Sequence, residues 1–348
     1  MAEQYGRLSE YSLDPDNKRM YAARKEQWEK QEYGAIDEYT SSKKEYDAQV
    51  HKLAKLEKET DNALNAYMDG MDTPQAAEYE EVFNKKFDET ENLKQIVKDL
   101  KAGLSGKEAK AVRQMEKELS LRTGIPIDKV EMSGLKYDTA KMVYDSYDVV
   151  LKKFPELKEQ LASFKYSSDL KGGTYAGCVT YTGEIKAYGK FANYEKLVQA
   201  YANDVAQGFH PVGTDHNSII VHELGHALDG YMSKKGLLDG NVHRTTSKTV
   251  KDMTLKLAGF DKQELADDLK KQGLTLSQRR DILEKKERDF IAEHVSVYAA
   301  KYDYVKNRTK VDSEREFFAE CFAEYMMSDN PRKTAKIFGE IIETALGR

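Results

Sequence analysis

The chain has 348 residues, of which 40% are hydrophobic and 33% charged, and its formal net charge is −5. That length is enough for two domains or for one domain with a long appendage, and the slightly acidic balance argues against a nucleic-acid partner. Two cysteines cannot build a disulfide framework. The sequence lacks an apolar run of membrane-spanning length, and its start lacks the apolar core of a signal peptide, so we expect a cytoplasmic protein with no membrane partner.

The N-terminal part is expected to be a long helical arm. Few helix breakers occur between Pro15 and Pro74, and apolar residues recur there at spacings of three, four or seven, which favours a long amphipathic helix or a helical hairpin. They are Tyr21, Trp28, Tyr39, Tyr46, Val50, Leu53, Leu56 and Leu64. Gly34 and the pair at 41–42 are candidate bends, and a second helix is predicted at about 75–102. Residues 1–102 are therefore expected to form a helical arm or coiled-coil-like region, which either binds a partner or packs on itself.

The rest of the chain, 108–348, follows a predicted linker, "GLSG" at 103–106. Between 171 and 191, glycines bracket short runs rich in Tyr, Val, Thr and Ile, which predicts two or three antiparallel strands. Helical patterns predict further elements at about 107–122, 137–152, 155–164, 194–207 and 248–300, with a turn near Gly273, and two helices within 313–346 broken at "SDNPR". The expected fold class is α+β, predominantly helical, with a small antiparallel sheet.

The stretch "HNSIIVHELGHALDG", 216–230, contains the pattern H-E-x-x-H at His222, Glu223 and His226. Residues four apart share one helix face, so both imidazoles can reach one Zn²⁺, and Glu223 can take a proton from a zinc-bound water. Apolar neighbours predict that this helix is buried, and a metal satisfies buried histidines and acids well. The alternative is two core histidines hydrogen-bonded to carboxylates. Gly225 leaves room for a neighbouring backbone or for the metal and its ligands.

A catalytic zinc site needs a third protein ligand. A third histidine at the metzincin spacing is absent after His226, so a downstream helix must supply the ligand. The stretch "DSEREFFAECFAEYM", 312–326, offers Glu316, Glu320 and Glu324 on one stripe beside aromatic residues. Exposed positions on the helix surface are the alternative, above all for Glu314 and Glu324.

The pairing of H-E-L-G-H-A-L-D with E-F-F-A-E resembles the catalytic domain of anthrax lethal factor and the Pro-Pro endopeptidases. The resemblance implies a zincin-like domain of the gluzincin type, with Glu316 as the third zinc ligand and Glu320 supporting the ligands from behind. It also implies that the tyrosine of "VSVYAA", Tyr298, stabilises the oxyanion of the transition state. Tyr298 precedes Glu316 by 18 residues, a longer link than in that family, so Tyr302 and Tyr304 stay open as alternatives.

A second resemblance covers about 108–348. The peptides "LSLRTGI", "VEMSGLKYDTAK", "KKFPEL", "FHPVGTD" and "HELGHALD", in this order, resemble the metallopeptidase-like region of phage minor capsid, or head morphogenesis, proteins. The resemblance implies a phage, prophage or mobile-element protein, located in the host cytoplasm or incorporated in a virion. Phage capsid or portal proteins would then be partners of the N-terminal helices.

Two functions follow from these patterns. The first is a zinc-dependent endopeptidase acting on a protein or peptide, which would pair as an extra strand with the edge of the run at 175–188. The second is a non-catalytic minor capsid or assembly protein that retains a structural zinc site. Asp229 is expected either to orient a zinc ligand through a hydrogen bond or to lie on the helix surface. His210 is expected at the site entrance, and His216 at the start of the motif helix.

Overall fold

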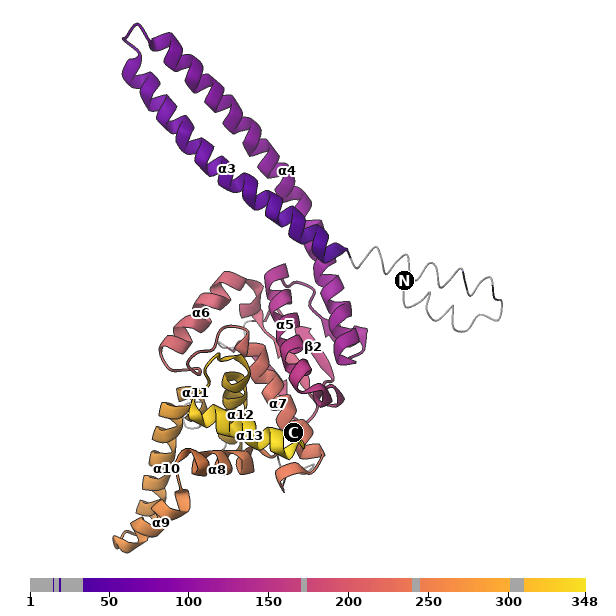
Figure 1. Ribbon diagram of the computed structural model, residues 1–348, viewed down its shortest axis with the longest axis vertical. Helices are drawn as coiled ribbons and strands as arrows, with labels where there is room; N and C mark the ends of the chain where they lie inside the picture. Colours follow the sequence, from indigo (N-terminus) through magenta and orange to yellow (C-terminus); the bar gives the residue numbers. More distant parts are fainter. Residues whose placement is uncertain (1–14, 16–18, 20–33, 170–173, 240–244, 301–309) are drawn as a thin grey trace. The chain divides into compact units, whose positions relative to one another are not determined.

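The computed structural model of the chain (Figure 1) describes residues 15, 19, 34–169, 174–239, 245–300 and 310–348. The chain divides into two compact units, 1–114 and 115–348, which are described separately below. Within the described ranges, every helix is too short or too polar to cross a membrane. The predicted apolar positions Tyr21 and Trp28 lie outside the described residues.

The first unit contains a helical hairpin. Helix α3 (Ala35–Gly70) and helix α4 (Ala76–Thr123) run antiparallel and are joined by the turn that contains Pro74. Lys86 of α4 lies 2.7 Å from Glu59 of α3, and the hydroxyls of Thr60 and Thr90 lie 2.7 Å apart between the helices. The described part of 15–74 is thus one long helix, and the predicted second helix at about 75–102 pairs with it. Gly34 immediately precedes α3, whereas the proposed bend at 41–42 lies inside an unbroken helix.

The predicted linker was wrong. "GLSG" at 103–106 is helical and lies within α4, which continues without a break to Thr123. Both glycines are open to solvent on their Cβ side, with nothing within 4 Å of a Cβ built at either one. A glycine costs a helix about 1 kcal/mol relative to alanine, so two of them weaken a long helix without ending it. The division between the units consequently falls inside α4, after Gln114, and not at 102–108.

The second unit contains a four-stranded sheet in the order β1-β2-β4-β3. The strands are β1 (Val130–Glu131), β2 (Ser163–Tyr166), β3 (Ala176–Val179) and β4 (Glu184–Ala187). The predicted hairpin is present, since β3 and β4 pair antiparallel. The expectation of an antiparallel sheet was wrong, because β2 pairs parallel with both β1 and β4. The segment 155–164, predicted to be helical, forms a short 3-10 turn (Pro155–Glu159) and then enters β2.

Nine helices of the described residues belong wholly to the second unit. They are α5 (Tyr137–Lys153), α6 (Tyr194–Ala206), α7 (Ser218–Lys234), α8 (Ser247–Ala258), α9 (Lys262–Lys271), α10 (Leu276–His294), α11 (Val297–Ala300), α12 (Lys310–Met327) and α13 (Lys333–Ala345). Gly273, with φ +71°, makes the predicted turn between α9 and α10. The predicted break at "SDNPR" separates α12 from α13.

Helix α7 forms the centre of this unit. All its residues from Ser218 to Ser233 are buried, as the apolar composition predicts. It contacts α12, α5 and β3, and it comes close to α12 at Gly225. A Cβ built there would lie 3.1 Å from the Cα of Ala319 and 3.1 Å from the ring of Phe322. Glycine at this position therefore lets the backbones of α7 and α12 come together, as expected.

Candidate metal centre

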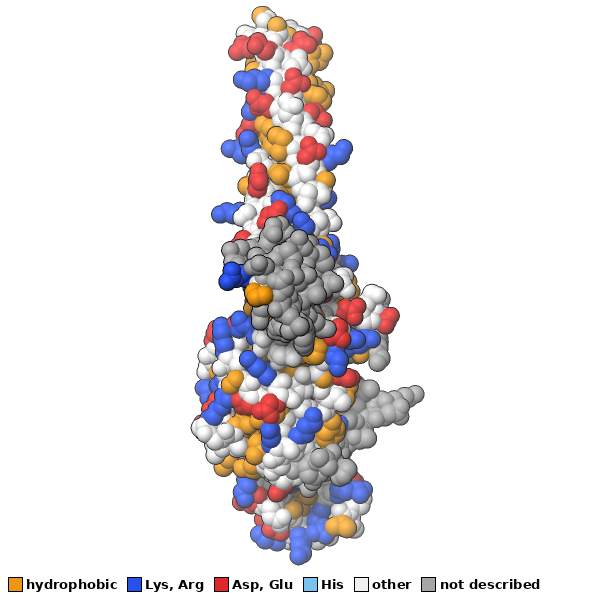
Figure 2. Space-filling view, turned by 90° about the vertical axis from the view of Figure 1, so that its right-hand side faces the viewer, with side chains coloured by type: hydrophobic (Ala, Val, Ile, Leu, Met, Phe, Trp, Pro, Cys, Tyr) orange, Lys and Arg blue, Asp and Glu red, His pale blue; other side chains and the backbone are white. Residues whose placement is uncertain are grey.

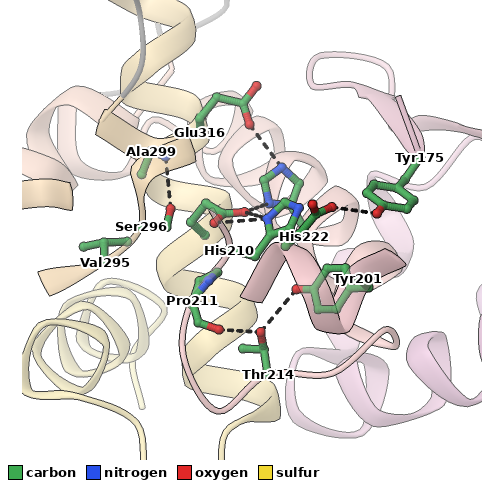
Figure 3. A network of polar contacts seen from close by, with 12 residues as sticks. Tyr175, Tyr201, His210, Pro211, Thr214, His222, Val295, Ser296, Ala299 and Glu316 are labelled. Atoms are coloured by element: carbon green, nitrogen blue, oxygen red, sulfur yellow. Dashed lines mark hydrogen bonds and ion pairs between the residues drawn. The ribbon is translucent and has the colours of Figure 1, made fainter. Parts of the chain in front are cut away.

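The packing of α7 against α12 brings three predicted ligands into one cluster. The Nε2 atom of His222 lies 3.1 Å from Oε2 of Glu316, and Nε2 of His226 lies 3.5 Å from the same oxygen. One donor atom from each of the three residues lies within 4.8 Å of the others. Figure 3 shows Glu316 pointing toward the imidazole of His222. Residues 94 positions apart in the chain thus share one site.

The cluster fits a zinc ion by donor type and by spacing. Nitrogen and oxygen ligands lie about 2.1 Å from zinc in proteins, so neighbouring ligand atoms of a tetrahedral site are about 3.4 Å apart. The two imidazole-to-carboxylate separations, 3.1 and 3.5 Å, bracket that spacing. Two imidazoles and one carboxylate leave a fourth tetrahedral position for water or substrate.

Interactions among the buried side chains shift the pKa values of His222 and Glu316 in opposite directions. Burial lowers the pKa of His222, but the carboxylates of Glu316 and Glu320 outweigh it and raise that pKa well above its ordinary value. Burial raises the pKa of Glu316, but hydrogen bonds from His222 and His226 outweigh it and hold that pKa well below its ordinary value. The Glu316 carboxyl is consequently an anion, which is the form that binds a metal.

Glu320 lies behind His222. Its carboxylate is 2.9 Å from Nδ1 of His222, the ring nitrogen that faces away from Glu316. The same carboxylate lies 3.2 Å from Nδ1 of His210, and the side chain of Glu320 is 1% exposed. Burial raises the pKa of Glu320, but the two histidines outweigh it and set that pKa at about 2. A carboxylate in this position fixes the orientation and tautomer of a ligating histidine.

Sequence reasoning missed the contact of His210 with Glu320. His210 was expected at the site entrance, yet its ring lies against this buried carboxylate (Figure 3). The ring also stacks on Tyr201 of α6, with centroids 4.9 Å apart and planes 15° from parallel. The aromatic residue before the histidine, Phe209, and the proline after it were a weak signal of a fixed ring. His216 behaves as predicted, next to the start of α7, and its Nε2 lies 2.9 Å from the Tyr194 hydroxyl.

Glu223 lies on the side of α7 that faces the sheet. It is 6% exposed. Burial raises the pKa of its carboxyl above the ordinary value, while the two histidines and a hydrogen bond from the backbone N–H of Cys178 act against that rise. Cys178 belongs to β3, so the carboxylate next to His222 is held by the edge strand of the sheet.

Tyr298 lies close to the cluster. Its ring centroid is 6.0 Å from that of His222 and 5.6 Å from that of His210. The backbone N–H of Tyr298 donates to the carbonyl oxygen of Phe209 at 3.1 Å, which ties α11 to the loop that carries His210. The alternatives Tyr302 and Tyr304 lie outside the described residues.

Asp229 is fully buried, so the surface alternative was wrong. Its Oδ1 accepts hydrogen bonds from the hydroxyl of Thr246 at 2.7 Å and from the backbone N–H of Ser247 at 3.0 Å. Both donors lie at the start of α8, where backbone N–H groups lack partners within the helix. Asp229 therefore holds the start of α8 against α7.

Glu314 and Glu324 are also buried, contrary to the surface alternative. Glu324 accepts hydrogen bonds from the Arg332 side chain, at 2.7 Å from Nη2, and from the Arg332 backbone N–H at 2.8 Å. Because Arg332 immediately precedes α13, this buried pair joins the end of α12 to the start of α13. Of the three glutamates on the predicted stripe, Glu316 and Glu320 contact the histidines and Glu324 has a structural partner.

Comparisons with protein-family models, with curated proteins and with solved structures gave no match for this chain. The resemblances to lethal factor and to phage minor capsid proteins consequently stay predictions from the sequence.

Proposed function

We propose that the protein is a zinc-dependent endopeptidase. The observation that carries the proposal is the convergence of His222, His226 and Glu316, with Glu223 on the helical turn between the two histidines. Two imidazoles, one carboxylate and an adjacent buried acid are the groups that metal-assisted peptide hydrolysis requires.

Each group has a role in this proposal. His222, His226 and Glu316 would hold the zinc, which would supply Lewis acidity to lower the pKa of a water and to polarise a carbonyl. Glu223 accepts the proton of the attacking water and later delivers it to the leaving amine. Its raised pKa suits a group that must both accept and return a proton. The Tyr298 hydroxyl donates a hydrogen bond to the oxyanion that develops on the substrate.

The substrate is proposed to bind as an extended peptide along β3. Among the strands of the described residues, β3 lies at one end of the sheet order, so none of them pairs with one of its edges. Its Cys178 backbone also contacts Glu223, so a peptide paired with β3 runs past the proposed base. Strand addition binds the peptide main chain and leaves sequence preference to side-chain pockets.

The first experiment is elemental analysis of zinc in the purified parent, in Glu316→Ala and in Glu340→Ala. Glu340 is an exposed residue of α13 and provides the matched control. We expect one zinc per chain in the parent and in the control, and a large loss in Glu316→Ala. A parent that contains no zinc after purification with zinc present contradicts the proposal.

The second experiment tests the chemistry with Glu223→Gln. We expect this variant to retain zinc and to cleave a peptide library about 100- to 10,000-fold more slowly than the parent, because the general base is lost. Cleavage by the variant at the parent's rate contradicts the assignment of Glu223. A zinc-containing parent that cleaves no peptide favours the alternative, a non-catalytic assembly protein with a structural zinc site.

A further inference from the structure

The α3–α4 hairpin buries little of its own surface. Between residues 40 and 110, only Thr60, Gly70, Thr90 and Leu93 are buried. Large apolar side chains remain exposed in the same stretch, among them Val82 at 48% and Ile96 at 49%. An amphipathic helix gains most of its stability from packing its apolar face. The hairpin therefore has apolar surface for a further helical partner.

A groove marks where such a partner fits. It has a volume of about 450 Å³ and lies between α3 and α4, half-way along the hairpin. Leu56, Leu93 and Ile96 form its apolar lining, and three lysines, two glutamates and one asparagine form its polar lining. Val82 and Ile96 are 14 residues apart, or about four helical turns, so they lie on the same side of α4. Exposed apolar side chains thus lie on this side of α4 both at the groove and nearer the hairpin turn.

The charge of α4 reverses at the groove. Residues 76–91 contain six acidic and two basic side chains, whereas residues 92–114 contain two acidic and six basic ones. Figure 2 shows hydrophobic side chains among charged ones of both signs along the hairpin. A partner that lies along this surface must carry the opposite order of charge, basic beside 76–91 and acidic beside 92–114.

We propose that the occupant of this surface is the same hairpin of a second copy of the chain, packed antiparallel along α4. In an antiparallel pair, the basic half of each copy lies beside the acidic half of the other copy. The two-fold axis passes near Leu93, where the charge reverses and the groove lies. Such an interface is isologous, because the same surface is used twice. A parallel pair would instead place acids against acids and is disfavoured.

The proposal is independent of the metal centre and is tested on the full-length protein by sedimentation velocity at micromolar concentration. We expect a dimer for the parent and a monomer for Ile96→Glu, which places a charge in the apolar groove. The matched control is Leu276→Glu, since Leu276 is 77% exposed and lies outside the hairpin; it should remain dimeric. Circular dichroism of Ile96→Glu should be unchanged, because the substituted side chain is half exposed. A monomeric parent, or a dimer that Ile96→Glu leaves intact, overturns the proposal.

Charge exchange tests the antiparallel arrangement. The variant Glu78→Lys/Glu81→Lys makes the acidic half more basic, and Lys107→Glu/Lys110→Glu makes the basic half more acidic, at positions close to the side of α4 that carries Ile96. Each double variant should weaken the dimer about tenfold, because several surface pairs worth a few tenths of a kcal/mol each become repulsive. The fourfold variant should regain most of the affinity, since its reversed halves again face each other. A fourfold variant as weak as the double variants rules out the antiparallel arrangement.

Discussion

Glu320 contacts the cluster from behind His222. Its buried carboxylate lies close to Nδ1 of His222 and to Nδ1 of His210. It therefore contacts His222 at the ring nitrogen that faces away from the proposed metal. We predict that Glu320→Gln lowers zinc affinity about 10- to 100-fold, which is the usual effect of losing such a supporting carboxylate. Competition with a chelator measures the affinity, and Glu340→Gln is the control. Unchanged affinity in Glu320→Gln would show that the contact is only structural.

Residue patterns predicted part of the site and not the rest. His222, Glu223 and His226 follow from helical spacing alone, because four residues make one turn. The roles of Glu316 and Glu320 could be predicted only from a second motif, E-F-F-A-E, and from the family resemblance that it carries together with the first motif. The His210 contact could not be predicted from spacing, since His210 and Glu320 are 110 residues apart and meet only through the loop after α6. The burial of Glu324 depends equally on a distant partner, Arg332.

At the scale of elements, Gly225 sets the distance between α7 and α12. Because the Cα of Ala319 would lie 3.1 Å from an added Cβ, Gly225→Ala must push α12 away from α7. That shift moves Glu316 relative to both histidines, so we predict weaker zinc binding and a lower unfolding temperature. Gly103→Ala is the matched control, since nothing lies near its Cβ position in α4. It should raise helix stability by up to about 1 kcal/mol. Normal zinc affinity in Gly225→Ala would contradict the prediction.

A buried ion cluster joins helices α8, α9 and α10. Lys251 lies 2.6 Å from Glu287, and Lys262 contacts the other oxygen of that carboxylate. Burial raises the pKa of Glu287, but the two lysines outweigh it and lower that pKa from 4.5 to about 2. A lowered folded-state pKa contributes stability above the unfolded-state value, and the contribution is lost as the pH falls from 4.5 to about 2.

We therefore predict that Glu287→Gln is less stable than the parent by about 3 kcal/mol at neutral pH, because Lys251 loses its buried partner. The difference should shrink below pH 4.5, as the parent's carboxyl becomes protonated. Chemical denaturation of both proteins at several pH values measures it. Asp289→Asn, an exposed position on the same helix, should show no such difference. A stability difference that is constant with pH would contradict the assignment of the pKa.

Long periodic elements were predictable, and short ones were not. The hairpin, α7 and the C-terminal helices follow from apolar spacing and from breakers such as Pro74 and Gly273. The linker was misplaced because Gly103 and Gly106 lie in a helix whose flanking residues outweigh their cost. Parallel pairing of β2 was not predictable, because a four-residue strand carries no periodicity and its partners lie far away in sequence.

At the scale of the whole molecule, metal binding should stabilise one unit and leave the other unchanged. The cluster belongs entirely to residues 115–348. A ligand present at 100 times its dissociation constant stabilises the folded state by about 2.7 kcal/mol. We predict that zinc slows hydrogen exchange in α7 and α12 and has no effect in α3. Mass spectrometry of peptides, with zinc and with chelator, measures this effect. Equal protection of α3 would show that the units unfold together.

The distance in sequence between the donors has a consequence for biosynthesis. Glu316 follows His222 by 94 residues. At typical elongation rates the ribosome needs roughly 5 to 20 seconds to translate such a stretch. During that interval the nascent chain carries both histidines without the carboxylate, so the three-donor cluster can assemble only after α12 has been synthesised. A chain released before α12 therefore lacks the third donor, and any activity that depends on it is withheld until α12 has been synthesised.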